Sequence, residues 1–255
     1  FLPFSTAVER GPNESKRTES ASEKMPFGAR GPPGGGGQAG SPAEFYWGLP
    51  VITRCWFTAA LASTLLAAVG MLSPGTLYLD WASVVYKFQI WRLFTNFAFL
   101  GKFGWPFIMN LIFMVQYSKT LEQDFKGVAA DFLWLLLLGG SLLMFINHVS
   151  GLALPFLTIP LIFMTIWIWS RIHPNAQMSV FGLFSISSAH FPWFLICLTM
   201  LMGGSPVANL MGYFVGHVYW FLKHVFQPTA GHAFFSAPSV IRRLVEDEEV
   251  HTTAT

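Results

Sequence analysis

Charged residues are almost missing from residues 132–222. No Asp, Glu, Lys or Arg lies between Phe132 and Ser170, and none lies between Ile172 and Leu222. A helix needs about 20 apolar residues to cross a bilayer, so each stretch is long enough for two crossings. Only 11% of the chain is charged, whereas soluble domains are about a quarter charged. The composition excludes an ordinary soluble domain and predicts an all-α polytopic membrane protein.

Cysteine and net charge are also scarce, and each scarcity excludes a kind of site. Cys55 and Cys197 are the only cysteines of the sequence, which excludes a disulfide framework or a cysteine-based metal site. We expect both thiols to be small buried side chains. The net charge of +2 is too small to indicate nucleic-acid binding. The histidines at 190, 217 and 224 lack the spacing of a zinc motif, so we expect no metal and no cofactor.

The sequence divides into three parts. Residues 1–42 are rich in Gly, Pro, Ser and Glu, and because such a segment buries little apolar surface we expect it to be disordered. It is either a plain cytosolic tail or the remnant of a targeting peptide, the second option resting on Phe1 where an initiating Met would stand. Residues 43–226 form the predicted membrane domain, and residues 227–255 form a polar cytosolic tail.

Six spans are predicted within the membrane domain. Apolar runs and the breaks between them place these spans at residues 51–72, 105–118, 132–149, 152–169, 178–202 and 206–226. The stretch 77–103 is aromatic but too charged to cross, so we expect it to lie in one membrane interface. Lys and Arg are concentrated in the connections on the opposite side, which predicts that both termini are cytosolic.

Several sequence patches resemble those of one known family. They read Ser-Pro-Ala-Glu-Phe-Tyr at 41–46, Phe-Gln-Ile-Trp-Arg at 88–92, Ala-Asp-Phe-Leu-Trp at 130–134, Trp-Ser-Arg-Ile-His-Pro-Asn at 169–175, and Gly-Gly-Ser-Pro at 203–206 followed by Gly-Tyr-Phe-Val-Gly-His at 212–217. Together they closely resemble the Derlins, the rhomboid-like pseudoproteases of endoplasmic-reticulum quality control. The resemblance covers about residues 41–240, in order and at family spacing.

The resemblance implies a rhomboid-like six-helix bundle with an interfacial first loop. It also implies a role in moving misfolded proteins out of the endoplasmic reticulum for ubiquitination and degradation. Trp91 and Arg92 would anchor and shape the first loop, since Trp favours the headgroup zone and Arg bonds backbone carbonyls. Gly212 and Gly216, spaced i, i+4, would let another helix approach closely. The ordinary alternatives are a simple interfacial anchor and a generic helix contact.

The expected partners also follow from this resemblance. They are the lipid bilayer, misfolded polypeptides, a ubiquitin-ligase complex and a cytosolic AAA ATPase. The C-terminal tail holds no clean copy of the Phe/Gly-rich motif with which some Derlins recruit the ATPase, so we expect that recruitment to be indirect. The sequence leaves homo-oligomers and hetero-oligomers open.

An active rhomboid serine protease is the disfavoured alternative within the same fold. Such enzymes need a serine in Gly-x-Ser-Gly on the fourth helix and a histidine three residues before the first glycine of the sixth-helix pair. The sequence has no Gly-x-Ser-Gly, and Asn209 stands three residues before Gly212. Because an amide cannot accept the serine proton, we expect a pseudoprotease without enzymatic activity.

Polar side chains within the predicted spans are the remaining candidates for function. Asn110, Gln116 and Tyr117 lie in or beside the second span, and Asn209 lies in the sixth. The ordinary interpretation is that they hydrogen-bond between helices. The sharper hypothesis is that those of the second span form a hydrophilic path for a passing polypeptide, in a bilayer thinned by that short span.

Two functions outside the endoplasmic reticulum are alternatives. A symbiont-derived Derlin that imports proteins across a plastid-surrounding membrane is favoured by the long extension beginning Phe1-Leu2-Pro3. A small-molecule transporter is disfavoured, because the sequence shows no internal repeat and no acid or base within a span.

Overall fold

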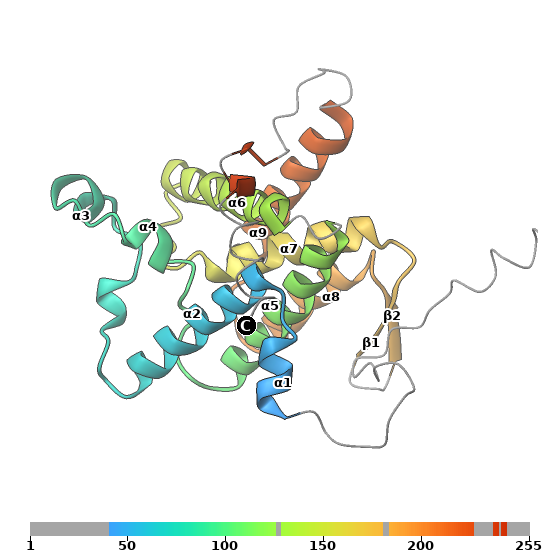
Figure 1. Cartoon of the computed structure of the whole chain (residues 1–255), viewed down its shortest axis with the longest axis horizontal. Coiled ribbons are helices and arrows are strands. Elements are labelled where there is room, and N and C mark those ends of the chain that lie inside the picture. The colour runs from blue at the N-terminus through green and yellow to red at the C-terminus, as the bar shows by residue number, and fades with distance from the viewer. Residues whose placement is uncertain (1–40, 126–128, 181–183, 227–236, 240, 244–255) are drawn as a thin grey trace, which may run out of the picture.

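Helices packed around one central helix make up most of the structure (Figure 1). This computed structural model describes residues 41–125, 129–180, 184–226, 237–239 and 241–243. The predicted disorder of residues 1–40 and most of the predicted C-terminal tail lie outside the described residues.

The elements follow in chain order. They are α1 (Pro42–Trp47), α2 (Val51–Ala68), the 3₁₀ turn η1 (Pro74–Thr76), α3 (Trp81–Tyr86), α4 (Arg92–Thr95), α5 (Trp105–Asp124), α6 (Ala129–Val149), α7 (Thr158–Ile172), β1 (Gln177–Val180), β2 (Phe184–Ser187), α8 (Phe191–Leu201), α9 (Val207–Phe221) and the π-helical turn η2 (Leu222–Phe226). The two strands form an antiparallel hairpin with Gln177 opposite Ser187 and Val180 opposite Phe184.

Helix α7 is the centre of the bundle. It contacts α5, α6, α8 and α9, and Thr158 and every residue from Pro160 to Ser170 are buried. A helix that is apolar all round must be enclosed by protein or by lipid, and here the neighbouring helices enclose it. The hydroxyls of Thr165 and Ser170 donate to carbonyls of the same helix, each at 2.7 Å. These polar groups are therefore satisfied without water.

Helices α2 and α6 lie toward the outside and present apolar side chains there. Among the described helices, these two are long and apolar enough to cross a membrane. Leu65 and Leu66 of α2 and Leu137 and Phe145 of α6 are exposed. Large exposed apolar surfaces are rare on soluble monomers and mark contact with a membrane or a partner. The outer surface of the bundle is therefore suited to lipid.

The two ends of the bundle hold different polar contacts. At one end, here called the acidic end, Glu122 of α5 meets the start of α2, and Asp124 meets His173 after α7. Asp131 at the start of α6 accepts a hydrogen bond from the backbone N–H of Ala237 at 2.8 Å. The described N-terminal and C-terminal segments therefore both lie at the acidic end. The opposite end, here called the loop end, carries residues 73–103 and the start of α7.

Three of the predicted spans need correction. The second was predicted to be short and to stop at residue 118, but α5 runs to Asp124 and has 20 residues. The fourth begins at Thr158 rather than at residue 152, because Pro155 and Pro160 resist a helix interior but Pro160 is tolerated in a first turn. The prediction of a short second span was therefore wrong, because α5 has 20 residues.

The fifth predicted span is the most different. Residues 177–187 contain the β-hairpin, and α8 has only 11 residues. A short apolar run cannot be assigned to strand or helix by composition alone. Pro192 occupies the start of α8, a position where its missing N–H costs nothing. At about 1.5 Å per residue, α8 is roughly 16 Å long, well below the roughly 30 Å of hydrocarbon.

The two cysteines also differ from expectation. Cys55 and Cys197 are exposed rather than buried. Each lies on an outward side of a helix, α2 and α8 respectively. A thiol is a small, largely apolar group, so its exposure to lipid in place of burial in protein is physically reasonable.

Candidate functional site

The contact between α7 and α9 depends on two glycines. A Cβ atom on Gly212 would lie 2.2 Å from the carbonyl oxygen of Pro160, and one on Gly216 would lie 3.0 Å from the Trp167 ring. Both glycines therefore face α7, and the backbones approach more closely than any larger residue would allow. This contact fixes the position of α9 beside the central helix.

Arg92 organises the loop end. Its side chain is buried, and its Nη1 donates to the carbonyls of Gly75 and Tyr78, each at 2.9 Å. Its Nε donates to Gln89 Oε1 at 2.7 Å. Three bonds in a fixed fork are within reach of a guanidinium but not of an ammonium group. Arg92 therefore joins α4 to the turn at residues 73–78.

Trp91 has a different position from its neighbour. Half of its side chain is exposed, and so are Phe88, Ile90 and Phe94. Figure 1 shows α3 and α4 projecting from the rest of the bundle. An exposed aromatic group on a projecting segment is suited to the headgroup zone of a bilayer. The two residues therefore have different roles: Arg92 holds the loop in its conformation, and the Trp91 side chain faces outward.

A carboxylate starts the projecting segment. Asp80 caps α3, accepting hydrogen bonds from the Ser83 hydroxyl at 2.6 Å and the Ala82 N–H at 3.2 Å. The Ser83 hydroxyl is the main reason that the pKa of Asp80 lies below its ordinary value. The group is therefore ionised at neutral pH, and its two oxygens accept the hydrogen bonds of the N-cap.

The turn after α4 is fastened to the bundle by side-chain hydroxyls and one indole. Thr158 donates to the carbonyls of Asn96 and Phe99 at 3.0 and 2.8 Å. Trp56 Nε1 donates to the carbonyl of Phe97, and Ser63 donates to that of Ala98, at 2.9 and 2.8 Å. The start of α7 and the side of α2 are thereby held against residues 96–99.

A cavity of about 270 Å³ opens at the loop end between α5, α7, α8 and α9. Its wall is mainly apolar, with Phe113, Phe163 and Met202 among the lining residues, and it includes the polar side chains of Asn110 and Asn209. Asn209 is buried, and its Nδ2 donates to Thr199 Oγ1 at 2.7 Å. Two amide side chains that are 99 positions apart (209 − 110) therefore border one space.

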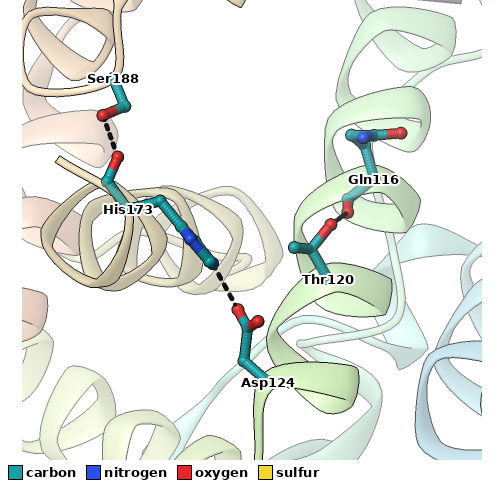
Figure 2. A network of polar contacts seen from close by, with 5 residues as sticks. All are labelled: Gln116, Thr120, Asp124, His173 and Ser188. Carbon is teal, nitrogen blue, oxygen red and sulfur yellow. Dashed lines mark hydrogen bonds and ion pairs between the residues drawn. The ribbon is translucent and has the colours of Figure 1, made fainter. Parts of the chain in front are cut away.

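The other two predicted polar residues lie elsewhere. Tyr117 is almost fully buried, with its ring 4.9 Å from Trp169 and 5.7 Å from Phe191. Gln116 is exposed on another side of α5, and Figure 2 shows its backbone carbonyl accepting a bond from Thr120. Asn110, Gln116 and Tyr117 therefore do not line a common path.

A serine, a histidine and an aspartate come together at the acidic end, but not as a catalytic triad. Figure 2 shows His173 Nε2 beside Asp124 Oδ2, at 2.7 Å. Ser188 donates to the backbone carbonyl of His173 and not to the imidazole ring. A nucleophilic serine needs the ring nitrogen as its base. The arrangement instead fastens the region after β2 to α7, and α7 to α5.

Sequence reasoning missed the most buried carboxylate among the described residues. Glu122 is 3% exposed, and it accepts hydrogen bonds from the N–H groups of Ile52 and Thr53 at 2.9 and 2.8 Å. The residue before α2 is Pro50, whose side chain cannot cap a helix. Glu122 supplies the missing cap from a distant helix. Its place in a charged connector gave no sign of this role.

The cavity has no features of a metal centre. Within the described ranges, no three His, Cys, Asp or Glu side chains gather closely enough to hold an ion. At the acidic end, Glu122 and Asp131 accept hydrogen bonds from backbone N–H groups, and Asp124 pairs with His173. The candidate site is therefore the apolar cavity with its two amides.

These features define a mostly helical membrane protein whose central helix is enclosed by its neighbours and whose amide-containing cavity opens at one end. Comparison with known sequences identifies the family of the protein. The chain belongs to the Der1-like family, whose model matches residues 49–239.

Curated relatives agree with this assignment. The chain is 36% identical to Derlin-1 of Oryza sativa subsp. japonica over 206 residues, covering 80% of this chain and 85% of the relative. It is also 36% identical to Derlin-2.1 of Zea mays and to Derlin-2.2 of Arabidopsis thaliana. Each of these matches spans 217 residues, or 81% of this chain, and covers 87% and 89% of the respective relative.

Proposed function

We propose that the protein is a non-catalytic component of a membrane complex that moves misfolded polypeptides from the endoplasmic reticulum to the cytosol. The observation that carries the proposal is the cavity bordered by Asn110 and Asn209. A polypeptide crossing a membrane must satisfy its backbone N–H and C=O groups. Amide side chains both donate and accept hydrogen bonds, so they suit an extended segment that has no regular sequence.

The short helix beside the cavity supports the same function. α8, with 11 residues, lines the cavity with Leu195, Leu198 and Thr199. A helix shorter than the bilayer is accommodated by local thinning of the lipid. Because α5 has 20 residues and α8 only 11, local thinning is attributed to α8 and not to the second predicted span. A thinner barrier beside an amide-bearing cavity lowers the cost of moving polar backbone across.

The absence of catalysis is supported by the side chains at the cavity. Asn209 donates its amide hydrogen to Thr199 and has no basic nitrogen to offer. Ser205 borders the cavity, but the lining residues that the structure describes include no histidine. The hydroxyl of Thr158, at the start of α7, already donates to two carbonyls. Proteolysis therefore lacks an activated nucleophile at this place.

The work of extraction requires partners. The sequence carries no nucleotide-binding motif. We therefore assign the energy supply to a cytosolic AAA ATPase that is recruited through a ubiquitin-ligase complex. Homo- or hetero-oligomers would complete a wider path from several copies of the cavity. The protein lies in the endoplasmic-reticulum membrane with its acidic end and both termini in the cytosol, since Lys and Arg are more frequent on that side.

Clearance of a misfolded membrane client tests the proposal. Asn110→Leu and Asn209→Leu should each slow the loss of a pulse-labelled client several-fold in cells that lack the endogenous protein. Gln116→Leu is the matched control, because it makes the same change on an exposed side of α5. Normal clearance with both cavity variants, at normal protein abundance, would reject the cavity as a client site.

The alternative in a plastid-surrounding membrane is tested by location. A C-terminally tagged full-length protein should give a reticular pattern, with its N-terminal residues intact on Edman sequencing. A ring around the plastid, with residues 1–40 removed, would instead support protein import.

A further inference from the structure

A second, larger groove lies on the outer side of α7, α8 and α9, away from the amide-bearing cavity. It has a volume of about 480 Å³, within the range of about 300–1,000 Å³ that ligand sites occupy. Its lining residues are Trp167, Arg171, Trp193, Leu210, Tyr213, Phe214, His217 and Trp220. All but two of these side chains are aromatic or aliphatic.

The floor of the groove is rigid. Trp167 and Tyr213 are buried, with their rings 5.4 Å apart, and the Tyr213 hydroxyl donates to the carbonyl of Pro192 at 2.8 Å. Trp167 also packs against Gly216, so the close contact between α7 and α9 sets its position. The floor is therefore determined by the same contact that holds α9.

The walls of the groove face outward. Trp193, Leu210 and Phe214 are each about half exposed. Trp193 meets Trp167 edge to face at 6.2 Å, which places it across the floor. Apolar walls open to the outside of a membrane helix bundle are bathed in lipid chains. A protein or water-soluble ligand would have to displace those chains to enter.

One cation stands at the end of the groove. Arg171 is the only charged residue between Asp131 and Lys223. Its guanidinium lies 4.4 Å from the centre of the Trp167 ring, over the last turn of α7. The ion pairs found among the described residues are His173 with Asp124 and Arg242 with Asp131, and neither includes Arg171. The guanidinium therefore keeps donors for an outside acceptor.

We propose that this groove binds one anionic glycerophospholipid of the leaflet at the acidic end. The phosphate accepts hydrogen bonds from Arg171, and one acyl chain lies over Trp167 between Trp193 and Phe214. Arg suits planar, bidentate recognition of phosphate, and basic pockets between membrane helices bind anionic headgroups. The described lining residues include no carboxylate for the ammonium group of a zwitterionic lipid, so an anionic headgroup is preferred.

Lipid retention by the full-length protein tests this site. The protein is reconstituted with equal amounts of phosphatidylinositol and phosphatidylcholine of the same acyl chains, and the bound lipid is counted by native mass spectrometry. We expect about fivefold preference for phosphatidylinositol, because one basic side chain near an anionic headgroup favours binding by roughly this factor. Arg171→Gln should abolish the preference, and Arg171→Lys should retain part of it.

Matched controls separate this site from general membrane contact. Arg54→Gln removes another cation that stacks on a tryptophan, Trp47, at 5.0 Å and lies at the same end. It should leave the preference unchanged. Phe214→Ala should reduce retention of both lipids, whereas Phe221→Ala removes a half-exposed α9 phenyl group outside the groove and should not.

Three results would overturn the proposal. Equal retention of both lipids by the unaltered protein would mean ordinary lipid contact. Equal loss of preference in Arg54→Gln and Arg171→Gln would mean a general effect of charge. Glycerophosphoinositol lacks acyl chains. If it raised the Tm of the protein as much as the intact lipid does, the site would be one for a free phosphate ester.

Discussion

The carboxylate of Glu122 accepts two hydrogen bonds from Thr53, one from its backbone N–H at 2.8 Å and one from its hydroxyl at 2.7 Å. The two residues are 69 positions apart and both are buried. A carboxylate at a helix N-terminus also interacts favourably with the helix dipole. This contact fixes the beginning of α2 against the end of α5.

Replacing this carboxylate should destabilise the bundle. Glu122→Gln turns one acceptor into a donor that faces donors, and an unpaired buried donor costs about 1–3 kcal/mol. We expect a fall in Tm of several degrees, at about 2–4 °C per kcal/mol for a chain of this size. Tryptophan fluorescence in detergent measures it. Gln123→Glu, one residue further on and exposed, should leave Tm unchanged.

The buried arginine of the loop end should not tolerate lysine. Arg92→Lys keeps the charge but cannot donate to Gly75, Tyr78 and Gln89 together. We expect faster hydrogen exchange across residues 73–78 and easier proteolysis there. Lys87→Arg, at an exposed position of the same loop, is the control. Unchanged exchange in Arg92→Lys would mean that the guanidinium does not hold this turn.

Alanine at the glycines should give a ranked series. A Cβ at Gly212 meets backbone, the Pro160 carbonyl at 2.2 Å, whereas one at Gly139 meets the flexible tip of Met164 at 2.3 Å. Overpacking costs about 1–3 kcal/mol when neighbours cannot move. We therefore expect Gly212→Ala to lower the stability, measured by unfolding in denaturant, much more than Gly139→Ala. Equal losses would contradict the rigid contact of α9 with α7.

The pH below which the N-cap of α3 weakens follows from the pKa of Asp80. That pKa is lowered from 3.8 in the folded protein, so the carboxylate stabilises the cap fully above pH 3.8 and loses this effect only as the pH falls through the lowered value. Hydrogen exchange of residues 81–86 should therefore show no cap-dependent change between pH 7 and 5. Asp80→Asn, which caps equally well when uncharged, should remove any transition seen below pH 3.8.

Sequence patterns within a single element predicted part of the structure. The i, i+4 spacing of Gly212 and Gly216 puts both on one helix face, and both face α7. Arg92 bonds to the carbonyls of Gly75 and Tyr78, in the role that the family resemblance implied for it. Long charge-free runs indicated helices, although Pro155 and Pro192 moved their starts and residues 177–187 contain a hairpin.

Long-range partners could not be predicted from one sequence. Glu122 looks like a solvated residue of a connector, because nothing nearby in sequence shows that Pro50 leaves α2 without a side-chain cap. Asn110 and Asn209 meet at one cavity only through the packing of α5 and α9 on α7. Gln116 and Tyr117 were grouped with Asn110 by sequence, but helical rotation turns them to other sides.

Site-specific photocrosslinking tests the central claim most directly. A photoreactive amino acid is placed at Met202, which lines the cavity, or at Leu65, which is exposed on the outside of α2. Endoplasmic-reticulum membranes containing either variant are then given a labelled misfolded polypeptide. We expect crosslinks from position 202 and none from position 65, with position 202 losing them after Asn110→Leu. Crosslinks from both positions alike, or from neither, would contradict a polypeptide site in this cavity.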